Sequence, residues 1–101
     1  MTDHYFKMSL SDICLAVQLP ETVFVELVRH DIVNPAGEAP EEWVFDTTMV
    51  EIAKRAARLH RDFELDWPAV AVIEELIEQR EQLQSENELL RRQLQRFLDE
   101  F

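Results

Sequence analysis

Apolar residues recur at helical spacing in the first thirty positions and predict two short helices. The first would cover residues 9–17 with Ser9 as its N-cap. Its apolar face comprises Leu10, Ile13, Cys14 and Val17. Pro20 suits the first turn of a second helix, which would run to about His30. Two short helices joined by a tight turn predict a helix-turn-helix.

The pattern changes between residues 31 and 46. A short apolar pair, Ile32-Val33, precedes a turn-rich run over residues 34–41 that holds the only glycine, Gly37. Aromatic and β-branched residues follow at positions 43–45. This order predicts a small β-hairpin, or wing, which would be marginally stable unless it packs on the helices.

A third helix is expected to begin at a cap among Asp46, Thr47 and Thr48 and to run to about Leu65. Helical spacing relates its residues Met49, Ile52, Ala53, Ala56, Leu59, His60 and Phe63. Its exposed side offers two charge pairs at i,i+4 spacing, Glu51–Arg55 and Arg58–Asp62.

The last stretch is a heptad pattern. Asp66 can cap a fourth helix with Pro68 in its first turn. From residue 73 onward, steps of three and four relate Ile73, Leu76, Arg80, Leu83, Asn87, Leu90, Leu94, Phe97 and Phe101. An asparagine at an a position is a known way to fix the register of a coiled coil.

This stripe has to be buried, either on a second chain or on the chain's own domain. We favour a homodimer, with the dimerisation residues Ile73, Leu76, Leu83, Asn87, Leu90, Leu94 and Phe97. The alternative is an intramolecular helix packed on Phe63, Trp67 and the wing. The predicted fold is mainly α. Residues 1–66 would form a winged helix-turn-helix with a third helix, and residues 67–101 a C-terminal helix with a coiled-coil segment.

Composition narrows the possible functions. The 101 residues include 21 acids and 10 cations, for a net charge of -11. One glycine leaves no Gly-rich loop to bind phosphates, and one cysteine cannot form an internal disulfide. The longest apolar runs are too short to span a bilayer, and residues 1–4 do not resemble a signal peptide. We therefore expect a cytoplasmic protein that binds neither membrane nor nucleic acid directly.

Candidate catalytic and metal-binding residues are weak. Cys14 lies on an apolar helix face without a basic neighbour in sequence, so it is expected to be a small buried hydrophobe. His4, His30 and His60 are too far apart for a local metal site, and His60 is expected at a core boundary. No acid–base pair stands out among the carboxylates. We predict no enzyme, no catalytic residue, no metal and no cofactor.

The charges also argue against a DNA-reading surface. The second helix offers one cation, Arg29, against Glu21 and Glu26, and residues 1–40 hold two cations and six acids. Such a surface would repel phosphates. The one basic cluster, Lys54, Arg55, Arg58 and Arg61, is expected to pair within its helix and face solvent.

Acids gather instead around Trp67, where the third helix leads into the fourth. They are Asp62, Glu64, Asp66, Glu74, Glu75 and Glu78. These six residues are the predicted partner-binding site, a docking face for a basic helix. The alternative is ordinary surface charge.

The order of elements is similar to that of MerR-like regulators, and the chain resembles the CbpM-type chaperone modulators within that group. The resemblance covers residues 9–98, and its most discriminating piece is Leu65-Asp66-Trp67-Pro68 with Ala71 after it. The other matching stretches are residues 43–46, 55–59, 86–91 and 95–97. Ala69 stands where a glycine is expected in relatives.

This resemblance implies a non-enzymatic protein that binds the J-domain of a DnaJ-like co-chaperone, the curved-DNA-binding protein. It implies inhibition of that partner's co-chaperone and DNA-binding activities, by occupation of a basic helix of the J-domain. The alternative function is that of a MerR-like transcriptional regulator that binds DNA through the second helix and the wing.

Overall fold

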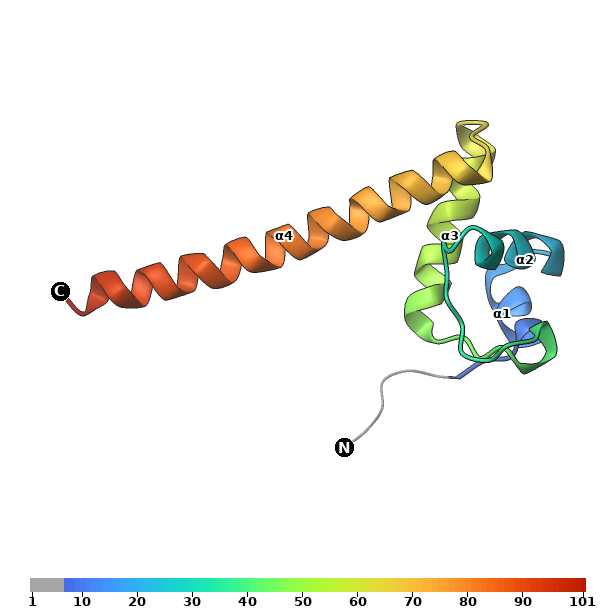
Figure 1. Ribbon diagram of the computed structural model, residues 1–101, viewed down its shortest axis with the longest axis horizontal. Coiled ribbons are helices and arrows are strands. Elements are labelled where there is room, and N and C mark those ends of the chain that lie inside the picture. The colour runs from blue at the N-terminus through green and yellow to red at the C-terminus, as the bar shows by residue number, and fades with distance from the viewer. Residues whose placement is uncertain (1–6) are drawn as a thin grey trace.

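Four α-helices and one short 3-10 helix make up the fold. The computed structural model describes residues 7–101, with α1 (Leu10–Val17), α2 (Glu21–Arg29), η1 (Pro40–Glu42), α3 (Thr47–Asp62) and α4 (Trp67–Asp99). In Figure 1, α1, α2 and α3 gather at one end, and α4 extends away from them. The four helices predicted from the periodicity are confirmed, although α2 and α3 end one and three residues earlier than expected.

Side-chain caps explain where α1, α3 and α4 begin. The Ser9 side chain accepts a hydrogen bond from the Asp12 amide, and the Asp12 carboxylate accepts one from the Ser9 amide, both at 3.2 Å. This reciprocal pair is a capping box. Asp46 caps α3 and Asp66 caps α4, each through a backbone amide 3.0 Å away. Each cap satisfies an amide that has no partner within its helix.

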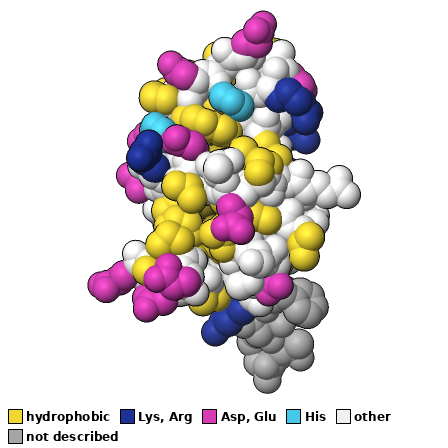
Figure 2. All heavy atoms as spheres, turned by 90° about the vertical axis from the view of Figure 1, so that its right-hand side faces the viewer, with side chains coloured by type: hydrophobic (Ala, Val, Ile, Leu, Met, Phe, Trp, Pro, Cys, Tyr) yellow, Lys and Arg dark blue, Asp and Glu magenta, His cyan; other side chains and the backbone are white. Residues whose placement is uncertain are grey.

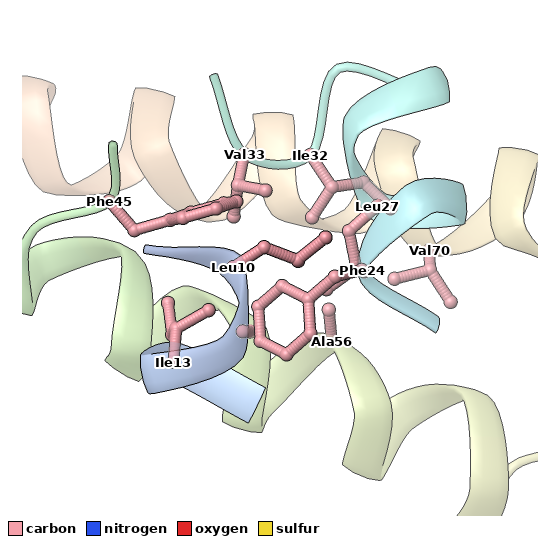
Figure 3. Close-up of a cluster of buried hydrophobic side chains, with 10 residues drawn as sticks. Leu10, Ile13, Phe24, Leu27, Ile32, Val33, Phe45, Ala56 and Val70 are labelled. Atoms are coloured by element: carbon pink, nitrogen blue, oxygen red, sulfur yellow. The ribbon is translucent and has the colours of Figure 1, made fainter. Parts of the chain in front are cut away.

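The core lies where the helices meet the segment that follows α2. Its fully buried members come from every α-helix and include Ile13, Phe24, Ala56 and Val70 (Figure 3). Phe45 packs edge-to-face on Phe24, with ring centroids 5.7 Å apart. The start of α4 is therefore part of the core.

The predicted β-hairpin wing is wrong. Within the described residues, only two isolated bridges form, Ala36–Val44 and Met8–Phe45. Between Ala36 and Val44 the chain makes a loop that contains η1. Two prolines explain the difference, because Pro35 and Pro40 have no amide hydrogen to donate to a strand ladder. The aromatic residues of this segment pack on the core without forming strands.

The intramolecular alternative for the heptad segment is also overturned. Every residue from position 78 to 101 is exposed. The helix has 33 residues, a length of about 50 Å, and only its first turns pack on the domain. Among the described residues, no helix is long and apolar enough to cross a membrane.

The loop depends on the chain's only glycine. Gly37 has a φ of 104°, and a Cβ at this position would lie 2.5 Å from the carbonyl oxygen of Glu42. Gly37→Ala should therefore lower the free energy of unfolding by about 1–3 kcal/mol. Chemical denaturation measures this loss. The exposed neighbour offers a control, Glu38→Ala, which should change it by less than about 0.5 kcal/mol. Equal stability of the two variants would contradict the claim that a side chain at position 37 strains the loop.

Candidate functional site

A salt bridge holds α4 against α3. Arg55 of α3 donates from Nε to Glu74 Oε2 at 2.9 Å and from Nη2 to Oε1 at 2.6 Å. The Glu74 side chain is only 7% exposed. The hydrogen bonds that Arg55 donates to the Glu74 carboxylate raise the pKa of Arg55, although partial burial lowers it. This bidentate salt bridge fixes both the relative position of the two helices and the angle between them.

The two ion pairs predicted within α3, Glu51–Arg55 and Arg58–Asp62, are both wrong. Arg55 pairs with Glu74 across helices, where Glu51 was expected, and Asp62 pairs with Arg61 at 2.9 Å, where Arg58 was expected. The reason is tertiary. A buried carboxylate from α4 lies within reach of Arg55, and a less hydrated partner binds a guanidinium more strongly than an exposed one.

The corner between α3 and α4 is stiffened by stacking. The His60 and Trp67 rings lie nearly parallel with centroids 3.9 Å apart. His60 Nδ1 lies 2.6 Å from the carbonyl oxygen of Leu65, a distance at which it donates a hydrogen bond. Glu64 between them adopts a left-handed backbone with φ 52°. His60 is exposed, so its expected place at the core boundary is wrong, although its ring is held by the stack and the hydrogen bond. The corner sets the direction in which α4 leaves.

A groove opens beside this salt bridge. It has a volume of about 990 Å³ and lies between α3, α4 and the segment after α2. Its floor is apolar and comprises Ile32, Val33, Met49, Ile52 and Ala71. Exposed carboxylates lie along its rim, namely Asp31, Glu51, Glu75, Glu78 and Glu81. We call this surface the acidic groove.

The other carboxylates that line the groove have structural partners. Asp46 caps α3, and Glu74 is held by Arg55. Arg55 is the only lysine or arginine along the lining. The net potential of the groove is therefore strongly negative, and walls of low dielectric focus it.

The structure separates the six predicted partner-binding acids into two groups. Glu75 and Glu78 lie on the groove rim, with Glu74 buried beside them. Asp62, Glu64 and Asp66 lie at the corner, outside the groove lining. Asp66 is occupied as the cap of α4, and Asp62 accepts a hydrogen bond from Arg61.

Sequence reasoning missed three rim residues. Glu81 follows Glu74 and Glu78 at helical spacing, so a helical wheel of α4 could have found it. Asp31 and Glu51 approach from other elements, and only the tertiary fold brings them to the groove.

The predicted dimerisation stripe lies along the extended part of α4. Its members Leu76, Leu83, Leu90, Leu94 and Phe97 are 49–64% exposed. Ile73 is half-buried at the start of the helix, and the amide oxygen of Asn87 accepts from Arg91 Nε at 2.9 Å. Such a series of large apolar side chains is an unpartnered face on this single chain.

The α2 surface does not provide a cationic DNA-reading face. Its one cation, Arg29, lies 3.5 Å from Glu26 Oε1. Figure 2 shows the side of the domain opposite to the extended helix, with hydrophobic side chains at the centre and cations only at separate points near the edge. Phosphate binding needs several converging cations, which this face lacks.

The weak chemical candidates remain unremarkable. Cys14 is half-buried. Burial raises the pKa of its thiol, the nearby charge of Glu21 raises it further, and both effects oppose thiolate formation. No group of three metal-ligating side chains occurs over residues 7–101. His4 lies outside the described residues.

Comparisons with known proteins match this chain nearly end to end. The family described as MerR HTH family regulatory protein matches residues 8–92. The chain is 41% identical over 91 residues to "Chaperone modulatory protein CbpM" of Pseudomonas putida (strain W619), which covers 90% of each chain. Its namesake in Pseudomonas entomophila (strain L48) is also 41% identical, with the same coverage. The namesake in Salmonella paratyphi B is 32% identical over 90 residues, or 89% of each chain.

The salt bridge between α3 and α4 gives a direct test. Arg55→Leu leaves the Glu74 carboxylate buried and unpaired, so the free energy of unfolding should fall by about 2 kcal/mol, discounted because Arg55 is one-third exposed. Arg55→Leu with Glu74→Leu removes both charges and should recover most of the loss. Chemical denaturation compares the two variants. Equal destabilisation by both would show that packing, and not the unpaired charge, causes the effect.

Proposed function

Because the chain belongs to the CbpM-type chaperone modulators, within the MerR helix-turn-helix regulatory proteins, we propose that it binds the J-domain of a DnaJ-like co-chaperone, the curved-DNA-binding protein. Binding inhibits the co-chaperone and DNA-binding activities of that partner. The observation that carries this proposal is the similarity, over nine-tenths of both chains, to proteins named chaperone modulators. The cytoplasmic location expected from the single cysteine stays a prediction.

The charge distribution supports a protein partner. A net charge of -11 repels phosphate and attracts a basic protein surface. A J-domain offers such a surface on the helix with which it engages its DnaK-type chaperone. A modulator that covers this helix excludes the chaperone by occupying the same site, without any chemical step.

The contact residues of this proposal are the exposed acids near the α3–α4 corner. Glu75 and Glu78 are exposed, and within the described residues they form no salt bridge. Asp62, Glu64 and Asp66 add charge at the corner. Glu74 contributes indirectly, because its pair with Arg55 holds the α4 backbone in place.

The proposal also includes a homodimer through α4. A helix whose last 22 residues are exposed has little to stabilise it alone in water, since most helical stability in proteins comes from packing. The a and d positions carry the exposed stripe, and the 27 helical residues from position 73 to Asp99 offer about 40 Å of seam. A second copy of the same helix is a self-complementary partner for this stripe.

The J-domain proposal predicts co-purification. The tagged full-length chain should retain the isolated J-domain of the curved-DNA-binding protein at moderate salt. The complex should weaken as salt rises, because charge complementarity contributes to it. A protein that does not retain the J-domain at low or moderate salt contradicts the proposed function.

The family match favours one second candidate, a regulator that binds DNA through α2. A mobility-shift titration over a range of salt concentrations separates the two. We expect only background binding to duplex DNA at physiological salt, because α2 presents a single cation. Specific shifts at that salt would favour the regulator.

The dimer proposal predicts that charge in the stripe disrupts assembly. Leu83→Asp with Leu90→Asp should give a monomer by light scattering, since two carboxylates would be buried in the seam. Gln82→Asp with Ser85→Asp adds the same charge on the opposite side of α4 and should leave a dimer. Asn87→Leu should raise the melting temperature of the dimer. A monomeric wild-type protein would refute the dimer.

A further inference from the structure

We infer that the acidic groove binds one basic amphipathic α-helix of the partner, with the apolar side of that helix on the groove floor. The inference rests on the proposed function and replaces a diffuse acidic surface with one defined site. It adds an apolar component to a contact that charge alone suggests.

The shape of the groove suits a helix. The groove is bounded on two sides by helices, α3 and α4, and its volume is about 990 Å³. Met49, Ile52 and Ala71 are half-buried on its floor, so each still exposes apolar surface. A helix laid in an apolar groove presents anchors at i, i+3, i+4 and i+7. Burial of these anchors supplies affinity that salt does not screen.

The charges of the groove select a basic occupant. Asp31 and Glu51 come from one side, and Glu75, Glu78 and Glu81 come from α4 on the other. Among residues 7–101, these five carboxylates form no ion pair with a lysine or an arginine. Two walls of like charge repel each other, and a cationic helix between them would relieve this repulsion. Lysine and arginine side chains that flank an apolar stripe meet both walls at once.

A second copy of the chain is not the occupant that this geometry favours. The groove positions on α4 are Ala71, Glu74, Glu75, Glu78 and Glu81, and the stripe begins with Ile73, Leu76 and Leu83. At 100° per residue, the centres of these two sets lie roughly half a turn apart around the helix. Dimerisation through the stripe therefore leaves the groove open, and each chain of a dimer offers one site.

Charge reversal on the rim tests the inference. Glu75→Lys with Glu78→Lys changes two exposed side chains that have no structural partner, so the variant should fold as the wild type does. In calorimetric titrations with the isolated J-domain of the curved-DNA-binding protein, we expect affinity to fall by about tenfold or more. Glu41→Lys with Glu42→Lys in η1 makes the same change of net charge outside the groove and should have an effect of less than about threefold.

A second variant tests the shape of the groove without altering charge. Asn34 lies exposed on the groove lining, and Asn34→Trp would obstruct the groove with a large ring. It should also weaken J-domain binding. Circular dichroism of each variant confirms that the fold is intact before its affinity is compared.

The outcomes separate this inference from the proposed function. The inference is overturned if the J-domain binds the wild type while the groove variants match the η1 control, and the proposed function then stands. A second probe, a synthetic amphipathic Leu/Lys helical peptide, distinguishes the remaining case. If the wild type binds this peptide through the groove but does not bind the J-domain, the groove assignment holds and the proposed function fails. The inference predicts one J-domain per chain, and binding of one per dimer would contradict it.

Discussion

The Arg55–Glu74 salt bridge is the contact on which the arrangement of this molecule depends. It joins the middle of α3 to the third turn of α4, with Val70 packed in the core one turn earlier. The His60–Trp67 stack stiffens the corner nearby. These contacts set the angle at which α4 leaves the domain. That angle in turn forms one wall of the acidic groove and directs the heptad stripe away from the body.

The two flanks of α4 have different properties because of this geometry. One flank faces the groove with carboxylates, and the other carries leucines into solvent. This chain of the MerR helix-turn-helix family thus presents a surface suited to protein contacts. The single cation of α2 and the negative charge of the whole chain also favour a protein partner over DNA. In the account proposed here, α4 assembles two chains with one flank and binds a partner helix with the other.

The sequence predicts the helices because their causes are local. Apolar spacing and the caps Ser9 and Asp66 are readable within four residues, and the structure confirms them. For α3 the sequence left three candidate caps open, and the structure shows that Asp46 is the cap. The prediction of a wing was wrong because it rested on the β-propensity of residues 43–45. It did not take account of Pro35 and Pro40, which interrupt a strand ladder. The partner of Arg55 could not be found from α3 alone, because the partner, Glu74, lies 19 residues further along the chain. The candidate site was found in part. Glu75 and Glu78 belong to it through their own helix, whereas Asp31 and Glu51 reach it through the tertiary fold.

The central claim is that this protein binds a partner helix in the acidic groove and does not bind DNA through α2. Hydrogen exchange of the full-length protein, with and without the isolated J-domain, tests it most directly, because protection reports where the partner lies. The account predicts slower exchange over residues 30–34, the first half of α3 and the first turns of α4, with α2 unchanged. Protection confined to α2 and the loop around η1 would contradict it.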